Sequence, residues 1–429
     1  MIKIGLCGLG TVGASFIEHI KNNYQLIKSN VGSDFQISAI ADRSIDKKDH
    51  DTNLLVTKNT LELAENSELD IIVELIGNVE VSYDLLRKSL NNNKHVITAN
   101  KALIAKHGEE LFLLAQKKEK YIGFEASVAG AIPIIQTLRN NFTNEKINSI
   151  VGIINGTSNF ILDKMSNTSC EFSSALSEAQ ILGYAESDPS FDINGQDAAH
   201  KIAILSSLAF GVKPPLDETY VEGIDQIMPM DINYADELGY VIKHVGITEL
   251  IGHQIISRVH PVLVPKGNIF AHVSGVMNAV IVEGERFGKS MLYGHGAGGS
   301  ATASAVVSDL VKAININKSS GSNLCPPIST GNKLDIRGID EVLSQYYLRI
   351  FAEDVPGVMA EITNRLAQVK ISIEAVTQHA PTDSSLSIPI VMITNNIKYS
   401  LVKSVISEIE NMPHINGEVF CIRLLDDNG

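Results

Sequence analysis

The sequence predicts an α/β protein with a doubly wound parallel sheet, a mixed α/β region and a small C-terminal βαββαβ unit. Two observations support this prediction. Over residues 1–133, short runs rich in β-branched residues alternate with helical periodicities, which is typical of a parallel sheet covered on both faces. From about Tyr346 onward, the order of elements changes to strand, helix, two strands, helix and strand.

The first unit is expected to span residues 1–133. Right-handed crossovers between its parallel strands would give the doubly wound arrangement. Its strands are predicted at 2–6, 35–41, 70–77, 95–98 and 121–124, with helices near 12–20, 83–90 and 103–118.

The remaining chain is expected to form two more units, 134–294 and 346–429, joined by a linker at 318–345. Residues 318–334 are rich in Ser, Gly, Asn and Pro, which favours a linker. The middle unit is predicted to have strands at 150–154, 255–259 and 279–282, with helices at 172–182 and 197–210. The tail is predicted to have strands at 347–352, 371–377, 388–394 and 419–424, with helices at 358–366 and 399–410.

Composition excludes several classes of protein. The 429 residues include 49 acids and 35 Lys or Arg, a net charge of −14 that disfavours general nucleic-acid binding. No stretch reaches the roughly 18–20 apolar residues of a membrane span. The four cysteines are far apart, which excludes a disulfide scaffold and suits a reducing compartment. We therefore expect a soluble, cytoplasmic protein with no nucleic-acid or membrane partner.

A glycine motif follows the first predicted strand and opens the first predicted helix. It reads Gly8-Leu9-Gly10-Thr11-Val12-Gly13, a G-x-G-x-x-G pattern. In this context the glycines allow a tight turn and close approach to a pyrophosphate, which indicates a Rossmann-type dinucleotide site. Asp42 and Arg43 end the second strand, where an acid binds a ribose 2′-hydroxyl and an arginine binds a 2′-phosphate. Because both are present, the choice between NAD and NADP stays open.

The most distinctive segment is AQILGYAESDPSFDINGQDAAHK at 179–201. Asp197 and Lys201 are four residues apart, so they share one face of the predicted helix. A surface ion pair is the simpler interpretation, but Lys201 runs directly into the apolar residues 202–205 and so borders a buried stretch.

This segment resembles the signature of homoserine dehydrogenases. Similar segments are TANKAL at 98–103, FEASVAGAIP at 124–133, NGTSN at 155–159, YGHGAG at 293–298 and TASAVV at 302–307. The resemblance runs to about residue 310, and the tail resembles an ACT domain through its turn at 354–358. It implies NAD(P)-dependent interconversion of L-aspartate 4-semialdehyde and L-homoserine, on the route to threonine, methionine and isoleucine. The chain departs from the family pattern at Asn78, His295 and Ala301, which bears on local loop shape.

The resemblance also implies site residues. Lys201 would be the proton donor, and Lys101 would contact substrate or cofactor with a share in catalysis. Asp197 would orient Lys201 and, with Glu186, bind the substrate ammonium. A positive charge beside the forming oxyanion would stabilise the transition state. The pocket would be lined by Gly156, Thr157 and Tyr184.

The same family match places a monovalent cation, most simply sodium, at Glu125 and the carbonyls of Val128, Gly130 and Ile132. One carboxylate with several carbonyls suits a hard, oxygen-binding ion. A buried, hydrogen-bonded glutamate at a strand end is the alternative. Gly298 is expected beside the cofactor, with residues 295–317 returning to the first unit.

The tail is expected to bind threonine between paired ACT units, so that deletion from Tyr346 onward would leave activity but abolish the threonine response. The family resemblance implies a homodimer through the middle unit, or a homotetramer if the ACT units also pair. Two other functions remain open: an amino-acid sensor that has lost catalysis, and a dehydrogenase for another semialdehyde. Absorbance of reduced cofactor during incubation with homoserine, and substrate competition, distinguish these possibilities.

Overall fold

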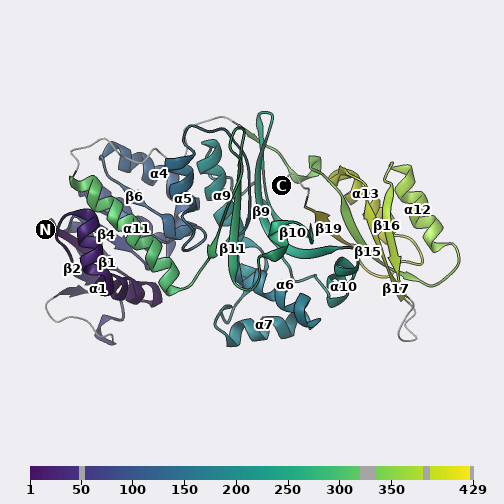
Figure 1. Cartoon of the computed structure of the whole chain (residues 1–429), viewed down its shortest axis with the longest axis horizontal. Helices are drawn as coiled ribbons and strands as arrows, with labels where there is room; N and C mark the ends of the chain where they lie inside the picture. The colour runs from purple at the N-terminus through teal and green to yellow at the C-terminus, as the bar shows by residue number, and fades with distance from the viewer. Residues whose placement is uncertain (48–53, 319–333, 380–386, 426–429) are drawn as a thin grey trace.

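The computed structural model describes residues 1–47, 54–318, 334–379 and 387–425. Figure 1 shows an elongated molecule with the N-terminal unit at one end, a long mixed sheet in the middle and the C-terminal unit at the other end. Within the described residues, no helix is both long enough and apolar enough to cross a membrane.

The N-terminal unit contains a six-stranded sheet, and all of its strand pairs are parallel. The prediction of a doubly wound parallel sheet is therefore confirmed. Strand order reverses between β1 and β4, so their carboxyl ends form the crevice in which such sheets bind ligands. Across the sheet the strands are β3 (Leu55–Thr57), β2 (Phe35–Ala41), β1 (Ile2–Cys7), β4 (Ile71–Glu74), β5 (His95–Thr98) and β6 (Ile122–Gly123).

Helices cover both faces of this sheet (Figure 1). One of them, α11, comes from a distant part of the sequence and lies beside α1. The contact is close, because a Cβ at Gly299 would lie 2.7 Å from the Ser15 hydroxyl oxygen. The helices are α1 (Thr11–Val31), α2 (Thr60–Glu65), α3 (Val79–Asn91), α4 (Lys101–Lys117) and α11 (Gly299–Lys318).

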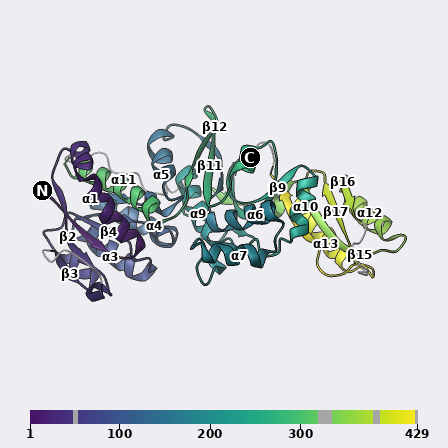
Figure 2. The same ribbon diagram turned by 60° about the horizontal axis from the view of Figure 1, so that its bottom comes forward.

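The middle unit contains most of a mixed sheet, together with the helices that pack on it. Its two longest strands, β9 and β10, form an antiparallel hairpin, and the sequence predicted only a part of β10. The strands are β7 (Ile147–Ile153), β8 (Tyr220–Val221), β9 (Tyr240–Ile251), β10 (Gln254–Pro265), β11 (Met277–Gly284) and β12 (Gly288–His295). The helices are α5 (Ile134–Gln136), α6 (Gly156–Thr168), α7 (Phe172–Ile181), α8 (Ser190–Ile193), α9 (Gln196–Phe210) and α10 (Pro229–Glu237). Figure 2 shows α6 and α7 together beneath this sheet.

The tail has the predicted βαββαβ order. Its four main strands lie in the order β19-β15-β17-β16 and pair antiparallel. The elements are β15 (Tyr346–Glu353), α12 (Val358–Gln368), β16 (Ile373–Gln378), β17 (Ser387–Thr394), α13 (Tyr399–Glu410) and β19 (Phe420–Leu424), with the short β18 (Ile397–Lys398) before α13.

The tail is not the independent unit that the sequence suggested. Strand β19 pairs in parallel with β10, through Val262 with Arg423 and Leu263 with Leu424, so that one sheet runs through both units. Tyr347 and Ile422 also pack into the apolar cluster around α6 and α10. Deleting the tail would expose this shared core, so we expect such a truncation to destabilise the middle unit. Of the predicted linker, 319–333 lie outside the described residues, while the rest includes β13 (Asp335–Ile336) and β14 (Leu343–Ser344).

Candidate active site

The three glycines of the loop 8–13 have different surroundings: two pack tightly against protein backbone, and one faces open space. A Cβ at Gly8, whose φ is +99°, would lie 2.4 Å from the Leu75 carbonyl oxygen, and a Cβ at Gly13 would lie 2.2 Å from the Gly8 carbonyl oxygen. Gly10 differs, because no other described residue beyond its chain neighbours lies within 4 Å of its Cβ position. It is the residue before α1, and the first N–H groups of a helix have no partner within the helix. The loop can therefore hold a phosphate at Gly10.

Asp42 and Arg43 occupy different environments at the end of β2. The Leu9 N–H donates to Asp42 Oδ2 at 2.7 Å, and the Ser44 N–H donates to Asp42 Oδ1 at 2.8 Å. Asp42 therefore fastens the glycine loop to β2, whereas Arg43 is exposed.

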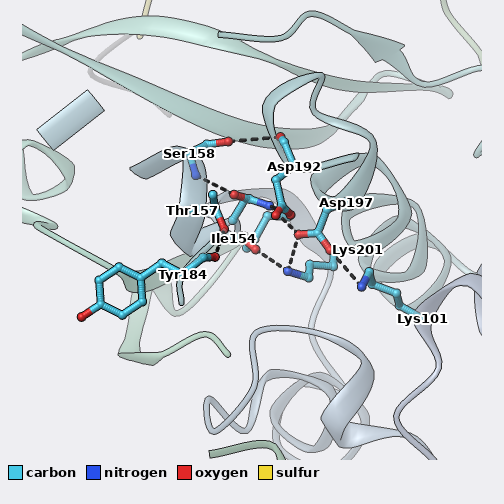
Figure 3. Close-up of polar contacts among 9 residues, drawn as sticks. Lys101, Ile154, Thr157, Ser158, Tyr184, Asp192, Asp197 and Lys201 are labelled. Atoms are coloured by element: carbon cyan, nitrogen blue, oxygen red, sulfur yellow. Dashed lines mark hydrogen bonds and ion pairs between the residues drawn. The ribbon is translucent and has the colours of Figure 1, made fainter. Parts of the chain in front are cut away.

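Two predicted lysines from distant segments converge on the carboxylate of the predicted Asp197 (Figure 3). Lys201 Nζ lies 2.6 Å from Asp197 Oδ2, and Lys101 Nζ lies 3.0 Å from Asp197 Oδ1. Lys201 also donates to the Ile154 carbonyl oxygen at 2.7 Å. Asp197 and Lys201 share one face of α9, whereas Lys101 is the first residue of α4, whose start is capped by the side chain of Asn100. The site thus forms where the N-terminal and middle units meet.

The two lysine ammonium groups determine the protonation state of the Asp197 carboxyl. Burial would raise the pKa of the Asp197 carboxyl, but Lys201 and then Lys101 outweigh that effect and hold the pKa well below its usual range. Asp197 is therefore a carboxylate at every ordinary pH. It is 4 % exposed and Lys201 is 8 % exposed, so the pair is shielded from water and fixed in position.

The structure adds two residues that the sequence reasoning missed, Asn155 and Asp192. The Asn155 side-chain amide donates to Asp197 Oδ2 and to Asp192 Oδ1, both at 2.8 Å. Burial, and then the nearby Asp197, raise the pKa of Asp192. Both residues lie in the segments quoted for the family resemblance, but only tertiary contact shows that they form one network with Asp197.

A cavity of about 720 Å³ joins the glycine loop to this cluster. The predicted substrate residues border it, and the Thr157 hydroxyl donates to the Tyr184 carbonyl oxygen at 2.7 Å. Figure 3 shows the Tyr184 ring pointing away from the two lysines. Predicted residues that line the cavity are Val12, Lys101, Gly130, Gly156, Thr157, Tyr184, Glu186, Asp197, Lys201 and Gly298. His295, a departure from the family pattern, also lines it.

The candidate cation site lies beside this cavity. Glu125 is 2 % exposed, and its carboxyl oxygens accept the N–H groups of Ile135 and Gln136 at 2.9 and 2.8 Å. Burial, and then the neighbouring Asp309, raise the pKa of Glu125 to about 8. The Lys312 ammonium lowers this pKa only in part. One carboxylate with backbone carbonyls is a donor set for a hard cation. Among the described residues, no group of three or more His, Cys, Asp or Glu could hold a metal.

The carbonyls of the candidate cation site come from a tight turn. Ala129 and Gly130 have φ values of 56° and 54°, and a Cβ at Gly130 would lie 2.6 Å from the backbone of Gly296. The turn is therefore pressed against the segment that returns toward α11. Gly130 lines the same cavity as Lys101 and Gly298, and Val128 and Ile132 lie on either side of it in the chain.

Models of known protein families match three parts of the chain. The NAD-binding domain of homoserine dehydrogenase matches residues 8–125, homoserine dehydrogenase matches 133–311 and the ACT domain matches 346–414. A homoserine dehydrogenase of Pseudomonas aeruginosa is 40 % identical over 99 % of this chain and 98 % of its own length. A homoserine dehydrogenase of Helicobacter pylori is 41 % identical over 99 % of each chain.

Solved structures agree with these sequence matches. The crystal structure of a homoserine dehydrogenase from Thiobacillus denitrificans has a TM-score of 0.93, is 42 % identical, and is matched over 100 % of this chain and 99 % of its own. A hyperthermophilic archaeal homoserine dehydrogenase in complex with NADPH has a TM-score of 0.63, is 29 % identical, and covers 73 % of this chain and 97 % of its own. Since the similarity extends from the glycine loop through the Lys101–Asp197–Lys201 cluster to the ACT domain, this chain belongs to the homoserine dehydrogenase family over its full length.

Proposed function

We propose that the chain interconverts L-aspartate 4-semialdehyde and L-homoserine, with Lys201 as the proton donor to the substrate oxygen. The observation that supports this most directly is the approach of two lysines to the single buried carboxylate of Asp197, at the wall of a cavity that reaches the glycine loop. This function serves threonine, methionine and isoleucine synthesis in the cytoplasm. An assay that follows NAD(P)H absorbance with homoserine and oxidised cofactor tests it, and no absorbance change with either cofactor would exclude it.

Lys201, Asp197 and Lys101 each have a different role in the proposed aldehyde reduction. The bound dinucleotide supplies the hydride. As the carbonyl carbon accepts the hydride, its oxygen gains negative charge, and the Lys201 ammonium transfers a proton to that oxygen. Asp197 orients the ammonium, and the Ile154 carbonyl restricts it further. Lys101 adds a second positive charge at the same carboxylate.

The amino-acid end of the substrate would be recognised by carboxylates. Glu186 lines the cavity with Asp197, and Asp192 lies there too. A substrate ammonium placed among these groups forms charge-assisted hydrogen bonds. Gly156, Thr157 and Tyr184 form the adjoining wall. The domain boundaries that fit this site are 1–133 with the returning 295–317, 134–294, and 346–429.

Cofactor choice depends on Arg43 in this proposal. An exposed guanidinium at the end of β2 can form paired hydrogen bonds with a 2′-phosphate. Arg43→Ala is expected to raise the KM for NADPH by roughly 10-fold and leave that for NADH nearly unchanged. Initial rates with each reduced cofactor test this, and an equal change for both would remove Arg43 from cofactor recognition.

A sodium ion at Glu125 would compete with a proton. The raised pKa means that the folded state binds this proton more tightly than the unfolded chain does. Without a cation, the contribution of Glu125 to stability is full below its ordinary pKa and is lost as the pH rises through about 8. We therefore expect sodium chloride, compared with choline chloride, to raise Tm more at about pH 9 than at about pH 6.

The matched control is Glu125→Gln, which keeps the shape of the side chain but cannot ionise. This variant should lose the pH dependence of the sodium effect. An equal Tm increase at both pH values in the unmodified protein would show that sodium acts elsewhere.

The ACT domain would sense threonine at the turn 354–358. Gly357 has a φ of +104°, and apart from its chain neighbours no described residue has an atom within 4 Å of its Cβ position, so a ligand could approach the backbone. The chain would form a dimer through the middle unit, or a tetramer if ACT domains also pair.

The proposed threonine site is better tested by Asp354→Ala than by deleting the tail, because deletion would disturb the sheet that the tail shares with the middle unit. We expect it to weaken threonine inhibition with little change in the uninhibited rate, measured by titrating threonine into the initial-rate assay; wild-type-like inhibition in this variant would place threonine elsewhere.

A further inference from the structure

Residues 220–224 connect the ACT domain to the candidate active site. On the ACT side, Arg423 in β19 donates through Nη1 to both carboxylate oxygens of Glu222, at 3.1 and 2.9 Å. Tyr220 also donates to Glu222 through its hydroxyl. The Glu222 N–H donates to the Val259 carbonyl oxygen at 2.8 Å, which fixes the segment along β10. Figure 1 shows β19 beside β10 at this junction.

The backbone of the same segment presses on the loop before α9. The Ile224 N–H donates to the Ile193 carbonyl oxygen at 2.9 Å. A Cβ at Gly223 would lie 2.6 Å from that oxygen, and a Cβ at Gly195 would lie 3.2 Å from the Glu222 carbonyl oxygen. The two backbones are therefore in direct contact at these positions. We expect a displacement of Glu222 to move residues 193–195.

Those residues set the start of the catalytic helix. Gly195 has a φ of +82° and precedes α9, which carries Asp197 and Lys201. Asp192, immediately before the contacted Ile193, shares the Asn155 amide with Asp197. A misplacement of about 1 Å at a reacting group can lower a rate by roughly 100-fold.

Stability alone is a weak explanation for Arg423. Its side chain is 2 % exposed, yet Nε and Nη2 have no hydrogen-bond partner among the described residues. Its guanidinium carbon lies 4.2 Å from the centre of the Tyr399 ring and 5.1 Å from that of Tyr220. Buried ion pairs commonly stabilise a fold no better than apolar residues of similar size, because removing both charges from water is costly. Among the residues that the structure describes, the carboxylate that Arg423 binds is that of Glu222, in the segment that touches the active-site loop.

We propose that Glu222 is a positioning residue for residues 192–197, and that Arg423 of the ACT domain holds Glu222 in place. The ACT domain thereby supports the geometry of the active site in the same subunit. This inference rests on the proposed roles of Asp197 and Lys201. It predicts that the Arg423–Glu222 pair affects the homoserine step more than dinucleotide binding, since no part of the glycine loop touches it.

A second buried ion pair provides a matched control. Arg349 of β15 pairs with Asp231 of α10, and these side chains are 5 % and 0 % exposed. Tyr347 also donates to Asp231, at 2.8 Å. This pair bridges the same two domains, but Asp231 bonds the start of α10 through the Met228 N–H and not the loop before α9.

The experiment compares Glu222→Gln with Asp231→Asn in the full-length chain. Each variant leaves one buried arginine without its carboxylate charge. We expect Glu222→Gln to lower kcat/KM for homoserine by roughly 10-fold, with the dissociation constant for the dinucleotide unchanged by fluorescence titration. Asp231→Asn, at a comparable loss of Tm, should leave kcat/KM within about two-fold.

Arg423→Lys tests the same contact from the ACT side and serves if Glu222→Gln does not fold. It should weaken homoserine kinetics by less than Glu222→Gln, and the double variant should be no worse than Glu222→Gln alone. Wild-type homoserine kinetics in either variant, or equal losses in Glu222→Gln and Asp231→Asn, would overturn the proposal. If Lys201→Ala stays active while Glu222→Gln is defective, the assignment of the proton donor fails but the positioning role does not.

Discussion

Lys201→Ala is expected to lower kcat by roughly 10²–10⁴-fold, the range that a positioned general acid contributes. Lys201 lies on α9 together with Asp197, whereas Lys101 lies on α4. The Lys201 ammonium is held by both Asp197 and the Ile154 carbonyl. Its removal leaves Lys101 to neutralise Asp197, so the fold should persist. Dinucleotide binding should also persist, because the glycine loop lies on a different element.

Rapid-kinetic and steady-state rates measure the expected loss of turnover. Fluorescence titration of NADPH measures whether dinucleotide binding persists. Lys106→Ala is a suitable control, since Lys106 is exposed on α4 and pairs only with the exposed Glu80 among described residues. Surface pairs of this kind contribute little to stability. Wild-type turnover in Lys201→Ala would show that another group donates the proton, and Lys101 would be the first to test.

Most of the N-terminal unit was predictable from sequence because its folding signals are local, although the short β3 and α2 were not predicted. Both faces of a parallel sheet are buried, so its strands are short apolar runs, and 35–41 and 95–98 were predicted with the bounds that the structure has. The glycine motif marked where β1 turns into α1. Such signals require no knowledge of distant partners.

The junction of the middle unit and the ACT domain could not be predicted in this way. Strand β9 includes polar residues such as Lys243 and His244 in its interior, which hide its apolar pattern. Both are nevertheless 3 % exposed, because Lys243 donates to the Val273 carbonyl oxygen and the His244 ring bonds the Glu222 carbonyl oxygen. The pairing of β10 with β19 joins residues some 160 positions apart, and periodicity carries no information on such a partner.

As with the fold, one part of the candidate site could be predicted from the sequence and another part could not. Lys101, Asp197 and Lys201 could be identified because they lie in distinctive segments. Their roles as one cluster, and the contribution of Asn155 and Glu222, depend on which segments meet in space. Glu222 in particular lies in an unremarkable stretch of sequence, and only its contacts with Arg423 and with the loop before α9 distinguish it from a surface acid.

Gly10→Val is expected to raise the KM for the dinucleotide by roughly 10–100-fold while changing the free energy of unfolding by less than about 0.5 kcal/mol. Gly10 has φ and ψ of −85° and −161°, an extended conformation that valine adopts readily. Nothing in the described protein lies within 4 Å of its Cβ position, so the new side chain meets no protein atom there. In the proposed binding mode, it would instead occupy the space in which the pyrophosphate approaches α1.

The neighbouring glycine supplies the contrast. Gly13→Ala would place a Cβ 2.2 Å from the Gly8 carbonyl oxygen, a backbone atom that cannot move without displacing β1. We expect that variant to unfold at a clearly lower temperature, by the overpacking that typically costs about 1–3 kcal/mol or more. Thermal unfolding combined with NADPH titration separates the two effects. A stable Gly10→Val protein with wild-type affinity for the dinucleotide would mean that the pyrophosphate binds away from the start of α1, because a valine at that position leaves no room for a phosphate against the helix N–H groups.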